Sequence, residues 1–498
     1  MYNITSVPQV NLNNRTFPVD VGCIVGGSSA VNAQGFQRGT KRDYNNCTDF
    51  LTHQLTFPVP IYQALREYTG VEVPIDHSVG VLGLSWTPRS MEPISFNRSY
   101  SRSGHYDGLN RDNYHLITAT RVERVVFKGK TADGVEISPR WPVEEHEGKG
   151  KSKDKGKGHN KGNGKRVIKA RKEVILSAGA IHTPQILQLS GVGPASLLKK
   201  AKIPVVVDLP GVGANLQDHA YEPLLQFNCL YPIVYPYLRG DTNTHPGTTP
   251  PPHPEVNTTI PPNSDFIYGP GLLLMIGLPV ISPARYQTLS ATYLAQSPGQ
   301  FFPPDTHPTI IAGYAQQQRL YAAGMLDKNF AFSATGLGGL PVAAPQLMHG
   351  LSRGTVTLNL SSPLSEPIVD YRFASNPLDL EIVAENLKFF RRFFTGPDST
   401  LKQYVNLTLG ETQPGPGYES DERLKDWLRD NLVPSVYHPS GTAAKMPREW
   451  GGVVSEGLEV YGVKRLSVID TSIFPTIVGA ATSMTVYAAA EKVCFFFP

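Results

Sequence analysis

A glycine-rich stretch near the start of the chain contains residue types that suit cofactor binding. Between Cys23 and Gly39 the sequence reads CIVGGSSAVNAQGFQRG, with paired glycines, two serines and an asparagine. Glycine carries no Cβ, so a ligand can approach the backbone closely at such a loop. Loops rich in Gly and Ser are also common as simple turns, so the stretch alone is a weak indication of a site. Its meaning depends on the elements that surround it.

Three later segments combine a short apolar strand with a small-residue loop. In the first, EVILSAG predicts a strand, and TPQILQLSG predicts a helix with Thr183 as N-cap, Pro184 as its first residue and Gly191 at its end. A second such unit is predicted in IPVVVDLPGVGANLQDH, and a third in RLSVIDTSIFP followed by ATSMTVYAAAEKVC. Buried strands that lead into such loops and helices predict an α/β cofactor-binding domain with a mostly parallel sheet.

The middle of the chain, roughly residues 220 to 430, lacks this alternation. Dispersed short strands are predicted in GTVTLNL and PIVDYRF, which indicate a separate antiparallel α+β domain. After the turn in TQPGPG, the spacing of Leu424, Trp427, Leu428 and Leu432 predicts an amphipathic helix.

Two segments are too polar or too rich in proline for a core. Residues 144–166 are dominated by Lys and Gly, which predicts a solvated loop insertion between strands; a patch that binds polyanions is the less favoured alternative. Residues 244–266 are rich in Pro and Thr and predict an extended linker or surface loop.

Composition excludes several classes of function. The chain has 498 residues, 40% hydrophobic and 18% charged, with a formal charge of +4, so a large core is expected and nothing electrostatic indicates nucleic acid. No apolar run reaches the ~18 residues that span a bilayer, so no membrane partner is expected. Four scattered cysteines without a CxxC spacing give no reason to expect a metal site. The expected partner is a small molecule, and the oligomeric state stays open.

Glycosylation signals and the N-terminus give opposite indications about a secretory route. Seven N-x-S/T sequons favour secretion modestly, whereas the first residues, MYNITSVPQVNLNN, have neither the basic nor the apolar region of a signal peptide. The sequons begin at Asn3, Asn14, Asn46, Asn97, Asn257, Asn359 and Asn406.

Three stretches, taken in their order and separation, carry a more specific signal. They are GGSSAVNAQGFQRGTKRDY (26–44), SAGAIHTPQILQLSGVGP (177–194) and the region from YHPSGTAAKM to SMTVYAAAEK (437–492). Together they closely resemble the signatures of the glucose–methanol–choline (GMC) oxidoreductases, FAD-dependent enzymes that oxidise the CH–OH group of alcohols. The fungal aryl-alcohol and glucose oxidase branch is the most similar. A role in fungal secondary metabolism and a secretory location would fit this branch.

The resemblance implies an active-site base and a set of cofactor contacts. His438 would remove the hydroxyl proton of an alcohol, a task that suits imidazole near neutral pH. The last helix would direct its N-terminus at the flavin, where the helix dipole stabilises negative charge. FAD contacts would come from the small-residue loops, the strand at residue 122, the last strand and the last helix: Gly26, Gly27, Ser28, Asn32, Val122, Ala178, Gly179, Asp470 and Thr482.

Two departures from the family pattern bear on function. No G-x-G-x-x-G occurs in the chain, so the FAD-binding domain is expected to be incomplete in its first βαβ unit, and the chain is expected to bind FAD poorly. Ala481 stands where the family places a second His or Asn opposite the catalytic histidine. Two alternatives to an FAD-dependent alcohol oxidoreductase therefore remain: a non-redox cyclase or dehydratase on the same scaffold, and an inactive binding protein.

The resemblance also implies a division into domains. An FAD-binding domain is expected in residues 1–45 and 105–219, and a substrate-binding domain with an antiparallel sheet in residues 46–104 and 220–432. Residues 433–498 would return to the FAD-binding domain and carry the active-site histidine.

Overall fold

The structure is a computed structural model. It describes residues 1–37, 82–86, 90–92, 97–140, 164–221, 225–227, 272–337, 342–405 and 410–494. The α-helices are α2 (Ser101–His105), α3 (Gly179–Leu189), α4 (Ala195–Lys200), α5 (Leu278–Ile281), α6 (Tyr286–Ala295), α7 (Pro308–Met325), α8 (Leu378–Thr395), α9 (Asp421–Asn431) and α10 (Ser483–Cys494). Short 3₁₀ helices are η1 (Val10–Leu12), η2 (Gly27–Ala30), η5 (Thr400–Tyr404), η6 (Arg448–Trp450) and η7 (Thr471–Ile473).

The strands form several small sheets. A five-stranded antiparallel sheet has the order β1 (Gly83–Trp86), β10 (Leu272–Gly277), β11 (Ala331–Leu337), β13 (Gln346–Leu347) and β8 (Ala220–Tyr221). A three-stranded antiparallel sheet has the order β12 (Val342–Ala343), β9 (Leu225–Phe227) and β16 (Glu411–Gln413). A second one has the order β2 (Thr120–Lys128), β3 (Thr131–Pro139) and β4 (Arg166–Lys169). The pairs are β14 (Thr355–Thr357) with β15 (Ile368–Asp370), β17 (Leu466–Val468) with β5 (Val174–Leu176), and β6 (Val192–Gly193) with β7 (Val207–Asp208).

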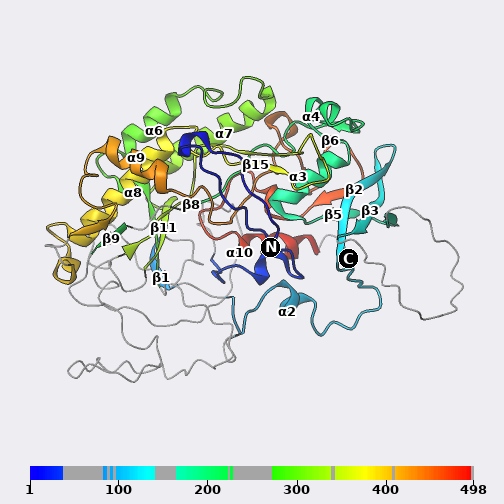
Figure 1. The fold of residues 1–498 in the computed structure, drawn as a ribbon, viewed down its shortest axis with the longest axis horizontal. Helices are drawn as coiled ribbons and strands as arrows, with labels where there is room; N and C mark the ends of the chain where they lie inside the picture. Colours follow the sequence, from blue (N-terminus) through cyan, green and yellow to red (C-terminus); the bar gives the residue numbers. More distant parts are fainter. Residues whose placement is uncertain are drawn as a thin grey trace, which may run out of the picture.

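The described elements fall into two regions with α10 between them (Figure 1). Helices α6 to α9 lie on the left with β8, β9 and β11, whereas α3, α4 and strands β2, β3, β5 and β6 lie on the right. The loop around Asn32 contacts the start of α10 at Ser483. The architecture is therefore mixed α/β with antiparallel sheets, in agreement with the mixed fold class expected from the sequence.

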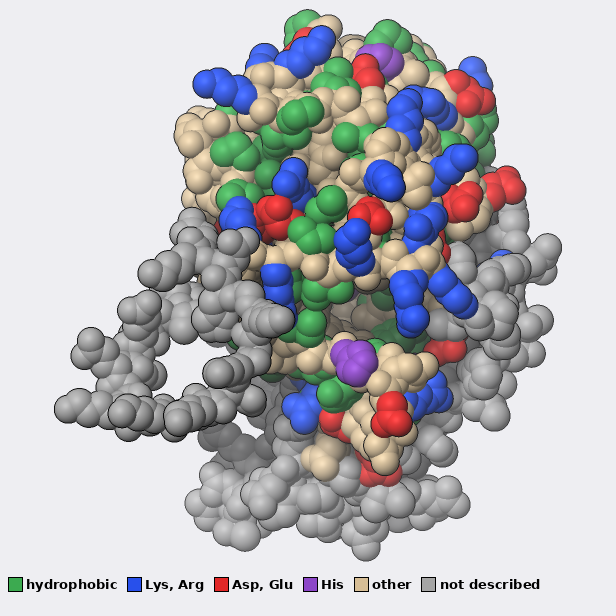
Figure 2. Space-filling model, turned by 90° about the vertical axis from the view of Figure 1, so that its right-hand side faces the viewer, with side chains coloured by type: hydrophobic (Ala, Val, Ile, Leu, Met, Phe, Trp, Pro, Cys, Tyr) green, Lys and Arg blue, Asp and Glu red, His purple; other side chains and the backbone are tan. Residues whose placement is uncertain are grey.

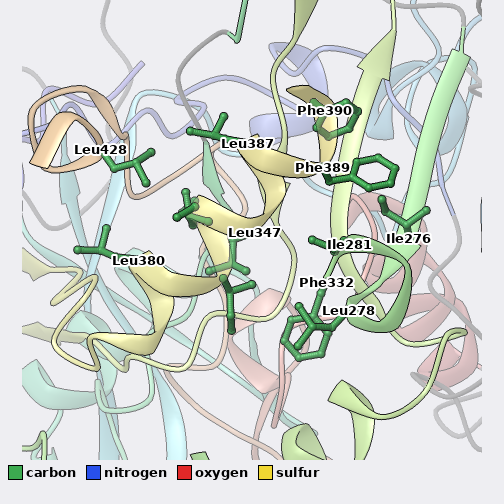
Figure 3. Close-up of a cluster of buried hydrophobic side chains, with 14 of the residues drawn as sticks. Ile276, Leu278, Ile281, Phe332, Leu347, Leu380, Leu387, Phe389, Phe390 and Leu428 are labelled. Atoms are coloured by element: carbon green, nitrogen blue, oxygen red, sulfur yellow. The ribbon is translucent and has the colours of Figure 1, made fainter. Parts of the chain in front are cut away.

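The larger hydrophobic core lies in the left-hand region and is organised by α8. Figure 3 shows Phe389 and Phe390 of this helix on the side of Ile276 in the sheet and Ile281 in α5, and Leu380 and Leu387 on the side of Leu428 in α9. Burying one such side chain stabilises a fold by roughly 1.5–3 kcal/mol relative to leaving it exposed. The Phe-rich face of α8 is therefore a main source of stability for this region.

Helix α9 confirms the amphipathic helix expected from the sequence. The Ser420 side chain accepts a hydrogen bond from the backbone N–H of Arg423 and caps the helix start. Leu424 and Leu428 are fully buried on one face. The antiparallel pair β14–β15 confirms the strands expected in GTVTLNL and PIVDYRF.

The right-hand region contains the parallel pairing. Strand β17 pairs with β5 and β7 pairs with β6 in parallel, whereas β2, β3 and β4 are antiparallel. Among the described residues, parallel pairing consists of these two strand pairs and two isolated bridges, Thr131–Lys464 and Lys445–Val454, so a mostly parallel sheet in this domain stays a prediction. The unit formed by β17 and α10 agrees with the sequence.

The prediction of a second strand–loop–helix unit is wrong. Strand β7 has only two residues, and the stretch that follows, 209–219, contains no helix. Its backbone groups instead bond to distant segments, since Leu216 bridges to Gly354 and Gln217 bridges to Ser440. Tertiary pairing therefore overrides the local pattern here.

Helix α3 begins five residues earlier than expected, and its N-cap is Ala178 rather than Thr183. Its first residue is Gly179, so Pro184 lies inside the helix. A proline lacks the N–H that would bond to the carbonyl four residues earlier, here that of Ala180. The hydroxyl of Thr442 donates to this carbonyl at 2.6 Å, so the acceptor is satisfied from another segment. Position 184 is thus tolerated because of a tertiary contact that the sequence did not indicate.

Other expectations concern the surface and the long loops. Residues 144–163 of the Lys/Gly segment and the whole Pro/Thr segment (244–266) lie outside the described residues. Figure 2 shows a face of the molecule on which Lys and Arg side chains are spread among Asp, Glu and hydrophobic ones. Within the described residues, no helix is both long and apolar enough to cross a bilayer.

Candidate active site

The site is formed where two distant segments run side by side. Residues 216–221 lie antiparallel to residues 433–440, with a bridge between Gln217 and Ser440 and a hydrogen bond from the N–H of Val436 to the carbonyl of His219. Between these contacts residues 434–439 form an irregular turn rather than a strand. The backbone contacts on either side of this turn bring His438 next to His219, although the two residues lie far apart in sequence.

The two imidazole rings contact each other edge to face. Nδ1 of His219 lies 2.9 Å from Nδ1 of His438, and the ring planes are at 87°. Nε2 of His219 lies 3.0 Å from the carbonyl oxygen of Val478, on the loop before α10. Among the residues that the structure describes, Nε2 of His438 has no hydrogen-bonding partner. His219 is completely buried, whereas His438 keeps some exposure.

The carboxylate of Asp218 holds the backbone of both histidines. Its Oδ1 accepts the N–H of His219 at 2.8 Å and that of His438 at 3.0 Å, and its Oδ2 accepts the hydroxyl of Ser435 at 2.7 Å. The Ser435 hydroxyl also accepts the N–H of Tyr437, whose φ of 65° is uncommon for a residue other than glycine. These bonds stabilise the turn that presents His438.

Burial dominates the electrostatics of this cluster. It lowers the pKa of His438 to about 4. The pKa of His219 is also well below its usual value, because of burial first and the neighbouring His438 and His349 second. Burial raises the pKa of Asp218 to about 7, although bonds from Ser435 and from nearby backbone N–H groups lower it. Both imidazoles are therefore neutral at pH 7.

A second group of expected site residues meets at the carboxyl ends of β5 and β17. Oδ2 of Asp470 accepts the N–H of Gly179 at 3.0 Å and the hydroxyl of Thr183 at 2.6 Å, and the Thr183 hydroxyl accepts the N–H of Ala178 at 3.1 Å. Since parallel strands end at the same edge, the residues after them come together there. Asp470, Ala178 and Gly179 thus lie together at this edge.

A third group joins the N-terminal loop to α10. The amide of Asn32 lies 3.4 Å from the hydroxyl of Ser483, next to Thr482, and its oxygen accepts a bond from Arg98 at 2.8 Å. Ser29 in the loop contacts Ser101, which in turn contacts Tyr487 on α10. This chain of contacts places the loop, including Gly26, Gly27 and Ser28, against the start of α10.

Three other expected residues have separate surroundings. Val122 on β2 packs against the same hydrophobic cluster as Ala178. Thr482 is buried immediately before α10. The N–H of Ala481 lies 3.4 Å from the side-chain oxygen of Gln37, and the methyl group of Ala481 has no polar atom to offer His438.

The backbone leaves room for a ligand at two of the expected cofactor positions. At Gly27 (φ 56°) and Gly179 (φ 77°) no heavy atom lies within 4 Å of where a Cβ would stand. Helix α10 also directs its positive N-terminal end toward the Asn32 loop, which suits a diphosphate or a reduced, anionic ring. The residues present therefore fit a nucleotide cofactor along this surface.

The sequence reasoning missed three residues of this site. His219 and Asp218 form the end of LPGVGANLQDH, which was interpreted only as part of a strand–loop–helix unit. Arg98 was not considered, although it orients Asn32. The available signal was the run of polar residues Gln217 to His219 directly after an apolar stretch, but its partners at 433–440 are more than 200 positions away.

Comparison with known proteins identifies the class. The N-terminal model of the GMC oxidoreductases matches residues 97–221, and the C-terminal model matches residues 350–490. Dehydrogenase xptC of Emericella nidulans is 31% identical over 98% of this chain and 83% of the relative. Patulin synthase of Aspergillus clavatus is 28% identical over 98% of this chain and 80% of the relative. The chain is therefore an oxidoreductase enzyme, and it belongs to the GMC family.

Solved structures agree with this assignment. An FAD-dependent oxidoreductase from Chaetomium thermophilum superposes with a TM-score of 0.84 at 27% identity, over 99% of this chain and 89% of that one. A fungal aryl-alcohol oxidase superposes with a TM-score of 0.82 at 29% identity, over 99% of this chain and 88% of that one. The family and these neighbours imply FAD as the cofactor and confirm the resemblance to the fungal branch.

Proposed function

We propose that this protein oxidises the CH–OH group of an alcohol in fungal secondary metabolism, with His438 as the base that takes the hydroxyl proton. The support for the pathway role is the similarity to patulin synthase. The support for a primary or secondary alcohol as substrate is the similarity to an aryl-alcohol oxidase.

The observation that carries the proposal is the hydrogen bonding of the two ring nitrogens of His438. Its Nδ1 is engaged by His219, whereas Nε2 has no partner among the described residues. A neutral imidazole with one unengaged nitrogen can accept a proton at that nitrogen. The low pKa of His438 keeps the ring neutral and ready to accept at pH 7.

The residues expected to hold FAD have distinct tasks in this proposal. FAD, when bound, would supply the acceptor for the hydride that leaves the carbinol carbon. Gly27 and Gly179 admit the cofactor to the backbone, Asp470 fixes the turn at Gly179, and Asn32 and Thr482 lie at the N-terminal end of α10. The boundaries proposed for the FAD-binding domain, 1–45, 105–219 and 433–498, enclose all of these residues.

A second candidate is acid–base chemistry without redox, such as cyclisation with loss of water. The specific observation in its favour is Ala481, which cannot orient a substrate hydroxyl. Removal of one member of a catalytic pair typically costs about 100-fold or more in rate. In this alternative, His438 would act as the sole acid or base.

A flavin experiment tests the proposal. Because the chain is expected to bind FAD poorly, bound-flavin absorbance is measured both with excess FAD present and after desalting. The sample with excess FAD is then mixed without oxygen with a panel of benzylic and aliphatic alcohols. We expect bleaching of the flavin with at least one alcohol, loss of bleaching in His438→Ala, and retention in His307→Asn, which replaces an exposed helix cap by another capping residue. Bound flavin that no alcohol bleaches, together with turnover of a cyclisation substrate, would favour the second candidate.

The proposed secretory route has its own test. The sequon residues Asn3, Asn14 and Asn97 are exposed, as glycan acceptors need to be. Protein expressed in a fungal host is treated with an N-glycosidase. A drop in apparent mass supports the route, and an unchanged mass contradicts it.

A further inference from the structure

We propose that His219 is a positioning residue that fixes the tautomer of His438, so that the proton sits on Nδ1 and Nε2 is left as the proton acceptor. The importance of this tautomer for catalysis rests on the function proposed above. The tautomer itself follows from the geometry of three groups: His438, His219 and the carbonyl of Val478.

Only one arrangement of protons satisfies both hydrogen bonds. The carbonyl oxygen of Val478 can only accept, so Nε2 of His219, 3.0 Å away, carries a proton. A neutral imidazole has one protonated nitrogen, so Nδ1 of His219 is an acceptor. The nitrogen facing it at 2.9 Å, Nδ1 of His438, must then be the donor. The reverse arrangement would direct a lone pair of His219 at the Val478 oxygen.

The surroundings of His219 keep its ring in this orientation. Turning the ring over would exchange nitrogens for carbons and lose both bonds, which costs roughly 1–3 kcal/mol for each buried group left unpaired. The groups that face His219 are His438, His349, the backbone carbonyls of Val478 and Met348, and Asp218, which binds its N–H. His219 is completely buried, so water does not compete for either nitrogen.

This arrangement assists the proposed proton transfer at both nitrogens of His438. The O–H bond of the alcohol breaks and an N–H bond forms at Nε2; FAD, when bound, would accept the hydride with its electron pair as the carbinol becomes a carbonyl. His438 then carries a positive charge, and its Nδ1–H bond to His219 becomes charge-assisted. Such bonds are roughly twice as strong as neutral ones, so His219 stabilises the charged ring more than the neutral one.

Two substitutions of His219 separate the bond to His438 from the bond to Val478. In His219→Asn the side-chain oxygen occupies the place of Nδ1 and can accept from His438, but the donor to Val478 is lost. In His219→Gln the terminal amide occupies the place of Nε2 and can donate to Val478, but the acceptor for His438 is lost. Each variant thus removes one buried hydrogen bond, so the two variants should destabilise the fold by similar amounts.

The readout is the protonation of each His438 nitrogen, measured by nitrogen NMR on protein labelled with ¹⁵N-histidine at pH 7. Signals of His438 are assigned by their absence in His438→Ala. We expect Nδ1 protonated and Nε2 unprotonated in the wild type and in His219→Asn, and a shift of the proton to Nε2 in His219→Gln. In stopped-flow flavin reduction, His219→Gln should be about 10- to 100-fold slower, and His219→Asn should stay within a few-fold of wild type.

The outcomes separate this inference from the proposed function. A wild-type His438 protonated on Nε2 overturns the inference without need of any His219 variant. An unchanged tautomer in a folded His219→Gln protein, checked by circular dichroism, overturns it as well. If the tautomers are as expected but no alcohol reduces the flavin, the proposed function fails and the positioning role of His219 stands.

Discussion

The carboxylate of Asp218 binds the backbone N–H of His438 at 3.0 Å, and the same oxygen binds the N–H of His219 at 2.8 Å. One buried side chain therefore sets the relative position of the two segments that carry the histidine pair. The second oxygen bonds to Ser435 and so stabilises the turn at Tyr437.

Removal of the Asp218 carboxylate should destabilise the protein. We expect Asp218→Ala to lower the free energy of unfolding by about 2–4 kcal/mol, because buried donors on His219, His438 and Ser435 lose their acceptor. Asp218→Asn keeps one oxygen for the two N–H groups and should cost less than half as much. Urea unfolding followed by circular dichroism measures both. Equal losses would show that the backbone bonds contribute little.

The ionisation of Asp218 should make the difference in stability between wild type and Asp218→Asn depend on pH. Its pKa is raised to about 7 in the folded chain, above the unfolded value of about 4. The folded state therefore binds more protons between pH 4 and 7, and stability from Asp218 is lost as pH rises through that window. We expect the stability of wild type relative to Asp218→Asn to fall from pH 4 to 7 and then stay level. A relative stability that rises with pH would mean that the hydrogen bonds outweigh burial.

The pH dependence of proton transfer should follow His438. Burial lowers its pKa to about 4, and only the neutral ring can take the hydroxyl proton. We expect the rate of flavin reduction, measured after a rapid pH jump from neutral stock, to be constant above about pH 5 and to fall about tenfold per unit well below pH 4. A midpoint near the ordinary histidine value of about 6.5 would show that His438 is better solvated than its position indicates.

The local elements could be predicted from the sequence where the spacing of apolar residues and the capping residues indicate the same element. Helix α9, strands β14 and β15, and the β17–α10 unit were expected because buried Leu spacing or β-branched runs reflect local burial. The histidine pair was not predicted, because His219 and His438 lie more than 200 residues apart in the chain. They meet only through backbone contacts between residues 216–221 and 433–440. The helix expected after β7 failed for the same reason: residues 209–219 form only short local turns, and Gly213, Leu216 and Gln217 bond to distant segments of the chain.

Asp470 should be as important to the cofactor side of the site as Asp218 is to the histidine side. Its buried carboxylate binds the N–H of Gly179, the hydroxyl of Thr183 and the N–H of Ser472 at 2.8 Å. We expect Asp470→Ala to lower the free energy of unfolding by about 2–4 kcal/mol, since these donors are left unpaired. The exposed Asp305→Ala serves as control and should change stability by less than about 0.5 kcal/mol. Equal effects of the two substitutions would contradict a structural role for Asp470.

The hydroxyl of Thr442 should be needed only because residue 184 is a proline. Thr442 donates to the Ala180 carbonyl at 2.6 Å, the acceptor that Pro184 cannot serve within α3. We expect Thr442→Val to lower the free energy of unfolding by about 1–3 kcal/mol, because a buried carbonyl loses its donor. In a Pro184→Ala background the new backbone N–H of residue 184 can bond to this carbonyl, so the same Thr442 substitution should cost at least about 1 kcal/mol less. A double-mutant cycle by urea unfolding measures this coupling. A coupling energy near zero would mean that the helix does not use the Thr442 bond, and that the proline is accommodated in another way.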